Sequence, residues 1–394
     1  MQKHLYKWMP ICFLIYLPTW FFLRTSQQET FFYFLIALPT LFLSTRLYQL
    51  LRNDTRTIVS LILFLVYFSF SSFWGEREFN KAIKSGVLLL CLLLAVETTV
   101  HRFNTKFLAN FITIIGGAAI CTHGFVSLLS NTEFSNIMSN RFSLDTTYGW
   151  GRSNPIDSAI ILGLPIISAW WLFPMKNWSL RTLLLLLIIC GTILIFFTQS
   201  RGPILALGAT LLIVTLIRKD RSDIVLMLSG CILFVILFFF TNIDEHINTR
   251  ISTPDYRIHI WKESIAQFLA HFWIGQGFGH NANIPISPDW TAGHAHSFVL
   301  EIIRVGGIIG ASLFCIMLFF MLNRFIFTSA GFFFLLWLIF GTLCLLTNGR
   351  LLLTYPWRIE CFAFWIPLLC LHFSSPSRIN DIAPPGLPPN WSTR

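Results

Sequence analysis

The sequence predicts an all-α integral membrane protein with about twelve transmembrane helices and one long loop outside the membrane. Of its 394 residues, 55% are hydrophobic and only 12% are charged, against about 25% charged in a typical soluble domain. The mean hydropathy is +0.68. The apolar residues fall in long runs separated by short polar stretches, which is the pattern of membrane spans rather than of a large soluble core.

Each of these apolar runs is expected to form a helix. The first resembles a signal peptide, but it lacks a small-residue cleavage site and continues past Pro18, so we interpret it as a span. The second is short and is completed by LSTRLYQL, in which Arg46 is expected to snorkel to the interface. The predicted spans cover roughly residues 8–23, 30–43, 57–74, 85–100, 107–130, 155–174, 182–198, 203–217, 224–241, 296–322, 327–347 and 359–373.

The distribution of Lys and Arg sets the orientation. With the N-terminus in the cytoplasm, the basic residues on the cytoplasmic side are about twice as dense as on the other side. Both termini are therefore predicted to be cytoplasmic and the loop 242–295 to lie outside. Anchoring of the spans also explains the net charge of +10. No basic stripe or known binding module is present, so we expect no nucleic-acid partner.

The spans and the outer loop are predicted to form a single membrane domain over residues 1–373. A proline-rich cytoplasmic tail over residues 374–394 is expected to be disordered. All nine cysteines fall inside apolar runs, so neither a disulfide framework nor a zinc site is expected.

The loop 242–295 is much longer than any other connection, and loops of this size are usually functional or disordered. It contains IHIWKESIAQFLAHFW, whose apolar residues recur at helical spacing. We expect an amphipathic helix on the membrane surface. Its apolar residues are Ile258, Trp261, Ile265, Phe268, Leu269 and Phe272.

The first of three polar motifs is TQSRGP at residues 198–203, which puts Arg201 at the outer end of a span. Gly202 and Pro203 suit a tight turn into the next helix, whose first amides favour an anion. An arginine at this position is also commonly a snorkelling side chain.

The second motif is STPDYRIHIW at residues 252–261, which puts Arg257 at the start of the amphipathic helix. The glycines of WIGQGFGHN are expected to end that helix in a flexible turn. Arg257 could bind an anion, or it could pair with Asp255 or Glu263 on a solvated face, and the charge pattern alone favours the ion pair.

The third motif is GHAHSFVLEIIRVGGIIGA at residues 293–311. It puts His296 at the start of a span, on the same helix face as Leu300, Ile303 and Gly307. A histidine there is more often an interfacial polar residue than a catalytic one. His294 is expected to point elsewhere if the helix has begun. The sequence offers no third ligand near these two histidines, so a metal site is not expected.

Together the three motifs resemble the O-antigen ligase and polymerase superfamily: SRG, then Arg-x-x-x-Trp with an amphipathic helix and a Gly-x-Gly-x-Gly turn, then the histidine at a span entrance. The resemblance covers residues 198–311 in motif and the whole chain in topology. The sequence departs from the family at Ser297, where asparagine is usual. Its outer loop is also compact for a ligase, which leaves the acceptor open.

The resemblance implies an inverting class C glycosyltransferase that needs no metal or other cofactor. Its site would lie at the periplasmic face of a bacterial inner membrane, in contact with membrane lipids. Such enzymes take a glycan from undecaprenyl pyrophosphate and join it to a hydroxyl, which for a ligase belongs to the lipid A–core oligosaccharide of lipopolysaccharide. Carried over by motif, Arg201 and Arg257 would bind the pyrophosphate and His296 would be the catalytic base for the acceptor hydroxyl.

Further candidates follow from the same resemblance. The family has charged groups between the fifth and sixth spans, which points to Arg141 and Arg152 in RFSLDTTYGWGRSNP. Arg358 precedes the last span, and His294 is the rival of His296 as the base.

Three other functions remain open. An O-antigen polymerase would use a second lipid-linked glycan as acceptor, and a pilin-type protein O-oligosaccharyltransferase would modify a Ser or Thr. A lipid or glycan transporter would also be a basic protein with many spans. Transporters usually hold ionisable residues near the bilayer midplane, whereas here they gather at one surface, so a ligase is the preferred interpretation.

Overall fold

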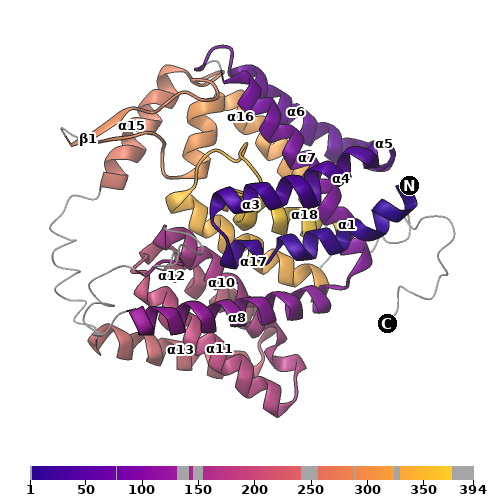
Figure 1. Ribbon diagram of the computed structural model, residues 1–394. Coiled ribbons are helices and arrows are strands. Elements are labelled where there is room, and N and C mark those ends of the chain that lie inside the picture. The colour runs from indigo at the N-terminus through magenta and orange to yellow at the C-terminus, as the bar shows by residue number, and fades with distance from the viewer. Residues whose placement is uncertain are drawn as a thin grey trace.

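The computed structural model describes residues 2–76, 78–130, 142–144, 154–240, 256–287, 290–323 and 329–374. These form a bundle of helices with a two-stranded hairpin at one end (Figure 1). The α-helices are α1 (Gln2–Tyr16), α2 (Thr19–Phe22), α3 (Thr25–Phe32), α4 (Leu38–Thr40), α5 (Ser44–Asn53), α6 (Thr55–Ser71), α7 (Phe79–Arg102), α8 (Thr105–Ser130), α10 (Pro155–Leu172), α11 (Trp178–Phe197), α12 (Arg201–Arg218), α13 (Arg221–Phe240), α15 (Tyr256–Ala270), α16 (Phe298–Leu322), α17 (Ser329–Asn348) and α18 (Ile366–Phe373). Short π-helical turns lie at Tyr33–Ala37 and Cys361–Trp365, 3-10 turns at Leu41–Leu43 and Phe173–Met175, and strands at β1 (Ile284–Ser287) and β2 (Trp290–Ala292).

Within the described ranges, seven helices are long and apolar enough to cross a membrane, or eight if the bent pair Thr25–Leu43 and Thr45–Asn53 is one span. The mostly helical fold agrees with an integral membrane protein. The apolar helices Thr55–Ser71 and Cys361–Phe373 are shorter. The total of twelve spans therefore stays a prediction. The predicted all-α class agrees with this mostly helical structure, to which the small hairpin β1–β2 is an addition outside the bundle.

The second predicted span differs from expectation at Arg46. Its side chain does not snorkel: it is 9% exposed and forms an ion pair with Glu97 of α7. Arg46 Nε donates to Glu97 Oε1 at 3.2 Å, and His101 Nε2 lies 3.3 Å from the same oxygen. A buried guanidinium needs such a carboxylate, because an unpaired charge away from water is costly.

Helix α10 lies almost wholly inside the bundle, against α8, α11, α12 and α17. Asn154 caps it by accepting the N–H of Ile156 at 2.9 Å, and Pro155 occupies the first helical position. Both are favoured residue types at those positions. Every residue of 158–172 is buried. A helix that is apolar all round is expected to be enclosed in this way.

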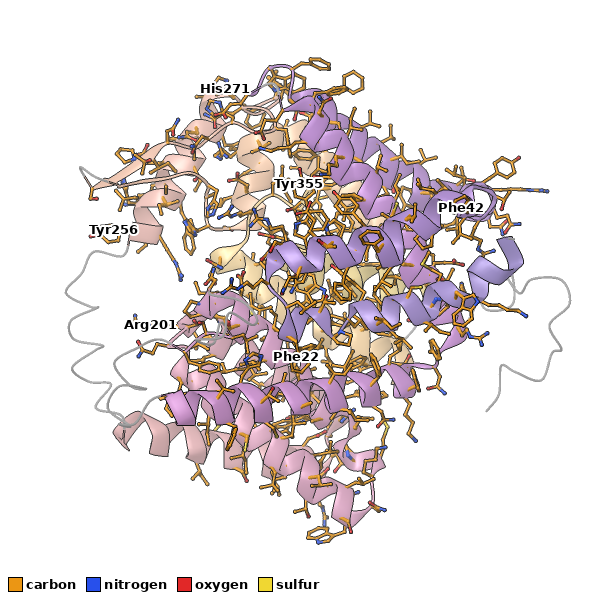
Figure 2. The ribbon with its side chains drawn as sticks, viewed as in Figure 1. Phe22, Phe42, Arg201, Tyr256, His271 and Tyr355 are labelled. Carbon is orange, nitrogen blue, oxygen red and sulfur yellow. The ribbon has the colours of Figure 1, made fainter. Side chains whose placement is uncertain are left out.

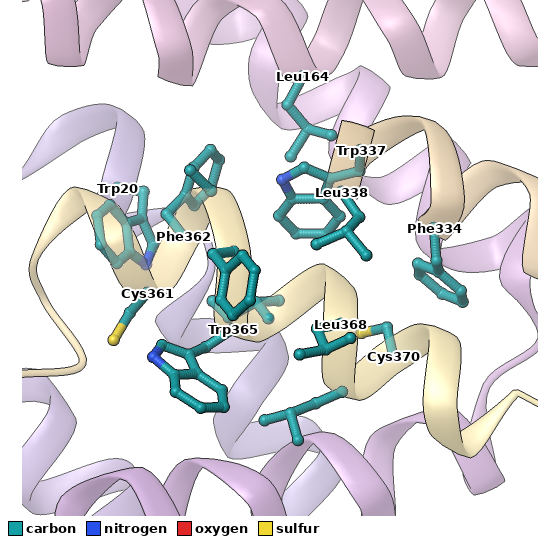
Figure 3. Packing of buried hydrophobic residues seen from close by; sticks show 14 of the residues in the cluster. Trp20, Leu164, Phe334, Trp337, Leu338, Cys361, Phe362, Trp365, Leu368 and Cys370 are labelled. Carbon is teal, nitrogen blue, oxygen red and sulfur yellow. The ribbon is translucent and has the colours of Figure 1, made fainter. Parts of the chain in front are cut away.

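The other central element is the π-helical turn Cys361–Trp365 with α18, whose residues are all buried. Phe362 packs between Trp20 and Trp337, with ring centroids 4.9 and 5.4 Å away (Figure 3). Large aromatic side chains provide much of the contact area in such a core. This element thus packs with α2 and α17 around one aromatic cluster.

Two long-range polar contacts lie at different ends of the bundle. At one end, His372 Nε2 lies 2.9 Å from Asp54 Oδ2. At the other, the N–H of Phe278 donates to Ser71 Oγ at 3.0 Å. In each pair, both residues lie at or near the same side of the membrane in the predicted topology, so these contacts are consistent with that topology.

Candidate functional site

Helix α15 and the hairpin form a small layer beside α16 (Figure 1). Ile260 packs with Ala282, Ile284 and Ala292 in a buried cluster of their own. On the same helix, Ile258, Ile265 and Leu269 are exposed at 52%, 43% and 63%. The expected helix is therefore present, with one face on the hairpin and an apolar face left open, although Phe272 lies beyond its end. The strands were missed because IPISPDWTA is short and interrupted by proline.

The segment 293–297, which carries His294 and His296 and is called here the histidine segment, directly follows the hairpin. The N–H of Ala282 donates to Gly293 O at 3.1 Å, which ties the start of the segment to the hairpin. Helix α16 then begins at Phe298, with Ser297 as its N-cap residue. His296 lies before the helix, in the left-handed region with φ +51°. The prediction that it shares a helix face with Leu300 and Gly307 is therefore wrong.

The two histidines also lie closer than expected. The rings of His294 and His296 are 4.0 Å apart between centroids, at 72°. The backbone N–H of His296 donates to Nδ1 of His294 at 3.3 Å. Because Nδ1 of His294 accepts this bond, a neutral His294 carries its proton on Nε2. The prediction that His294 points away assumed a helix that has not yet begun there.

Burial and nearby cations keep both histidines neutral. Burial lowers the pKa of His296 below 6.5, and the positive charges of Arg257 and Arg350 lower it further. A hydrogen bond to the Asn348 side chain and the charge of Glu301 act in the opposite direction on that pKa. Burial, His296 and Arg350 lower the pKa of His294 to about 4. With a pKa of about 4, His294 is a weak base.

Asn348 and Arg350 were not singled out from the sequence. They lie at and just beyond the end of α17, about 50 residues from the histidines in the chain. The backbone N–H of Arg350 donates to the buried carboxylate of Glu360 at 3.2 Å, which fixes that turn. Because the Asn348 bond favours the charged imidazolium, its side-chain oxygen accepts from a ring N–H of His296. The other ring nitrogen is then the acceptor that a base needs.

Arg201 is the first residue of α12 and is exposed. Its side chain extends outward on the side of the molecule where Tyr256 begins α15 (Figure 2). The next residue, Gly202, packs on α17: a Cβ there would lie 2.6 Å from Thr347 Oγ1. Glycine is therefore needed for α12 to approach the end of α17, next to Asn348.

A fixed turn, rather than a flexible one, follows α15. Gly275, Gly277 and Gly279 all have positive φ. The turn fills a kink in α16 at Gly307, where φ is +61°. Its backbone bonds to the kink are Gln276 N to Arg304 O at 2.9 Å, Gly277 N to Val305 O at 2.9 Å, Ile308 N to Phe272 O at 2.9 Å and Ile309 N to Trp273 O at 3.2 Å.

The remaining predicted residues fall as follows. Arg141 and Arg152 lie outside the described residues. Arg358 is exposed, and its backbone N–H donates to Tyr355 O at 2.9 Å. Among the described residues, no cluster of three His, Cys, Asp or Glu could hold a metal ion. The structure thus gathers Arg257, Asn348 and Arg350 around His296. Arg201 precedes Gly202, which packs against the end of α17 next to Asn348.

A basic, histidine-containing site at the end of an apolar helical bundle suits an anionic ligand. Residues 183–315 match the family described as O-antigen ligase. A protein of Pseudomonas aeruginosa (strain PAO1) named O-antigen ligase is 27% identical over 391 residues, covering 91% of this chain and 90% of that relative. The resemblance predicted from the motifs is therefore confirmed: residues 183–315 match the O-antigen ligase family model, and the similarity to the Pseudomonas aeruginosa protein extends along most of the chain.

Proposed function

We propose that this protein ligates O-antigen in lipopolysaccharide biosynthesis. It would transfer a glycan from undecaprenyl pyrophosphate to a hydroxyl of the lipid A–core oligosaccharide, at the periplasmic face of the inner membrane. The observation that carries the proposal is the neutral His296, held by Asn348 among Arg257 and Arg350. The match to O-antigen ligases over residues 183–315 supports the substrate class.

In the transfer step, the free ring nitrogen of His296 takes the proton of the acceptor hydroxyl. The oxygen attacks the anomeric carbon from the face opposite the leaving group, a new C–O bond forms, and the configuration inverts. The bond between the anomeric carbon and the pyrophosphate oxygen breaks, and its electron pair stays on that oxygen. The product is the glycosylated core, with undecaprenyl pyrophosphate released.

The arginines stabilise the negative charge that develops on the leaving pyrophosphate. Guanidinium groups can bind phosphate oxygens with two parallel hydrogen bonds, and such groups stabilise charge that grows in the transition state. Arg201 and Arg257 are assigned this role by motif. Arg350 is added because its charge acts on both histidines.

Deletion of the gene in its native host tests the proposal, with lipopolysaccharide examined on a gel. Loss of the long-chain ladder together with accumulation of the lipid-linked polymer supports ligation. Core bearing a single repeat identifies a polymerase instead. An unchanged ladder would refute both activities.

A further inference from the structure

Two charged residues on α16 are buried directly behind the histidine segment. Glu301 is 5% exposed and Arg304 1%. Arg304 Nε and Nη2 donate to the two carboxylate oxygens of Glu301 at 3.1 and 2.6 Å. This is the forked geometry that makes arginine–carboxylate pairs both strong and directional. Arg304 falls within the apolar run predicted over residues 296–322.

The pair reaches two separate segments. On one side, Glu301 Oε2 accepts the N–H of Ala295 at 3.0 Å, between the two histidines. On the other, Arg304 Nη1 donates to Gln276 Oε1 at 2.7 Å and Nη2 to the carbonyl oxygen of His280 at 3.1 Å. The second segment is the turn that ends α15, the helix whose first turn carries Arg257.

From these contacts we propose that Glu301 and Arg304 are positioning residues of the transfer reaction, which fix His296 relative to the helix that carries Arg257. The inference rests on the proposed function. The proposed base, His296, and the proposed pyrophosphate ligand, Arg257, lie on different segments. The distance between them must therefore be set by residues that contact both segments. The Glu301–Arg304 pair makes both contacts through hydrogen bonds of defined length.

Stability alone does not explain such a pair. Burying two charges is costly even when they are paired, and apolar replacements of similar volume are often at least as stable. The geometric role is different, because the pair fixes direction and distance at once. A shift of about 1 Å in a reacting group can cost on the order of 100-fold in rate.

The test uses purified protein in lipid nanodiscs with a lipid-linked donor. In Arg304→Lys the charge stays, but an ammonium cannot hold Glu301, Gln276 and His280 in one plane. We expect kcat to fall on the order of 10–100-fold, with the KM for donor changed less than about threefold. The neutral double variant Glu301→Gln/Arg304→Gln leaves no unpaired buried charge and provides the same test if Arg304→Lys does not fold.

Glu301→Gln gives a readout that a purely structural role would not move. The amide oxygen can still accept from Ala295, but the negative charge is gone. Since that charge raises the pKa of His296, we expect the acid limb of the kcat profile to move to lower pH. An unmoved limb counts against the proposal.

The matched control is Arg46→Lys, which alters a buried Arg–Glu pair elsewhere in the bundle. It should cost stability without changing the kcat of the folded protein or its pH profile. Wild-type kcat and pH profile in Arg304→Lys, while His296 variants are inactive, would overturn the positioning role alone. Wild-type turnover in His296→Gln would instead overturn the proposed role of His296 as the base, on which the positioning role rests.

Discussion

At the scale of single residues, the difference between His294 and His296 decides which one can act as the base. His294 Nδ1 accepts a backbone N–H, and burial lowers its pKa to about 4. His296 keeps one ring nitrogen as acceptor, and the Asn348 hydrogen bond and the charge of Glu301 oppose the fall in its pKa. Removing the proton of a hydroxyl in the transition state typically contributes about 10²–10⁴-fold.

We therefore expect His296→Gln to lose on the order of 10²–10⁴-fold in kcat while donor binding stays intact. His294→Ala should be mild and serves as the control. Turnover and donor affinity are measured on purified protein. A collapse in His294→Ala with a normal His296→Gln would move the role to His294.

The pH profile gives a second test. A base must be neutral, so activity should be retained down to the pKa of His296 and fall as the pH drops through it. Burial and the two arginines put that pKa below 6.5 in the free protein. Bound pyrophosphate would offset the arginine charges and raise it. We expect the acid limb of kcat to lie at higher pH than that of kcat/KM for donor; coincident limbs would contradict this linkage.

For the arginines we expect Arg201→Ala, Arg257→Ala and Arg350→Ala each to lower transfer at least about 100-fold without loss of membrane insertion. Lysine should rescue poorly, because an ammonium cannot donate as a fork. Arg181→Ala, whose side chain bonds to the carbonyls of Pro174 and Lys176, is the control. Glycan transfer in membranes measures the effect, and wild-type rates in all three would end the pyrophosphate assignment.

The motifs identified Arg201, Arg257 and His296 as candidates, and the structure brings Arg257 and His296 together. Asn348 and Arg350 could not be found this way, because only the return of α17 to the same end of the bundle places them beside His296. The left-handed backbone of His296 was equally hidden, since histidine adopts positive φ rarely and carries no local signal for it.

At the scale of elements, periodicity predicted α15 and most of α16. It did not predict the contact between the turn after α15 and the kink in α16. A helix pattern continues through GG without showing that Gly307 breaks the helix. The break leaves backbone donors that the turn after α15 satisfies. Since unpaired backbone groups are costly in an apolar environment, kink and turn require each other.

Gly277→Ala tests this junction. A Cβ there would lie 2.4 Å from Ser71 O, at φ +87°, and the left-handed backbone alone costs roughly 1–2 kcal/mol with a side chain. We expect lower thermal stability in detergent and reduced transfer. Gly208→Ala on α12, where nothing lies within 4 Å of the added atom, should lower neither, because alanine is the better helix former. Equal behaviour of the two variants would show that the turn is not tightly fixed.

At the scale of the whole molecule, composition predicted a helical membrane protein, and hydropathy located its apolar runs. The number of crossings was less accessible, because a run interrupted by a bend, as between α3 and α5, satisfies the same composition without being one straight span. The buried pair of Arg46 and Glu97 was hidden as well, since its partners are 51 residues apart.

The two ends of the bundle make the predicted sidedness testable. Residue Asn281 belongs to the end that carries His296 and the arginines, and its N–H donates to Glu76 in the connection between α6 and α7. Lys219 ends α12, one full helix away from Arg201. If the site handles a glycan outside the cytoplasm, these two positions must lie on opposite sides of the membrane. Alkaline-phosphatase fusions near Asn281 should be active and fusions near Lys219 inactive, because the enzyme folds only in the oxidising periplasm. The reverse pattern would place His296 in the cytoplasm and refute both the orientation and the glycan-ligation proposal.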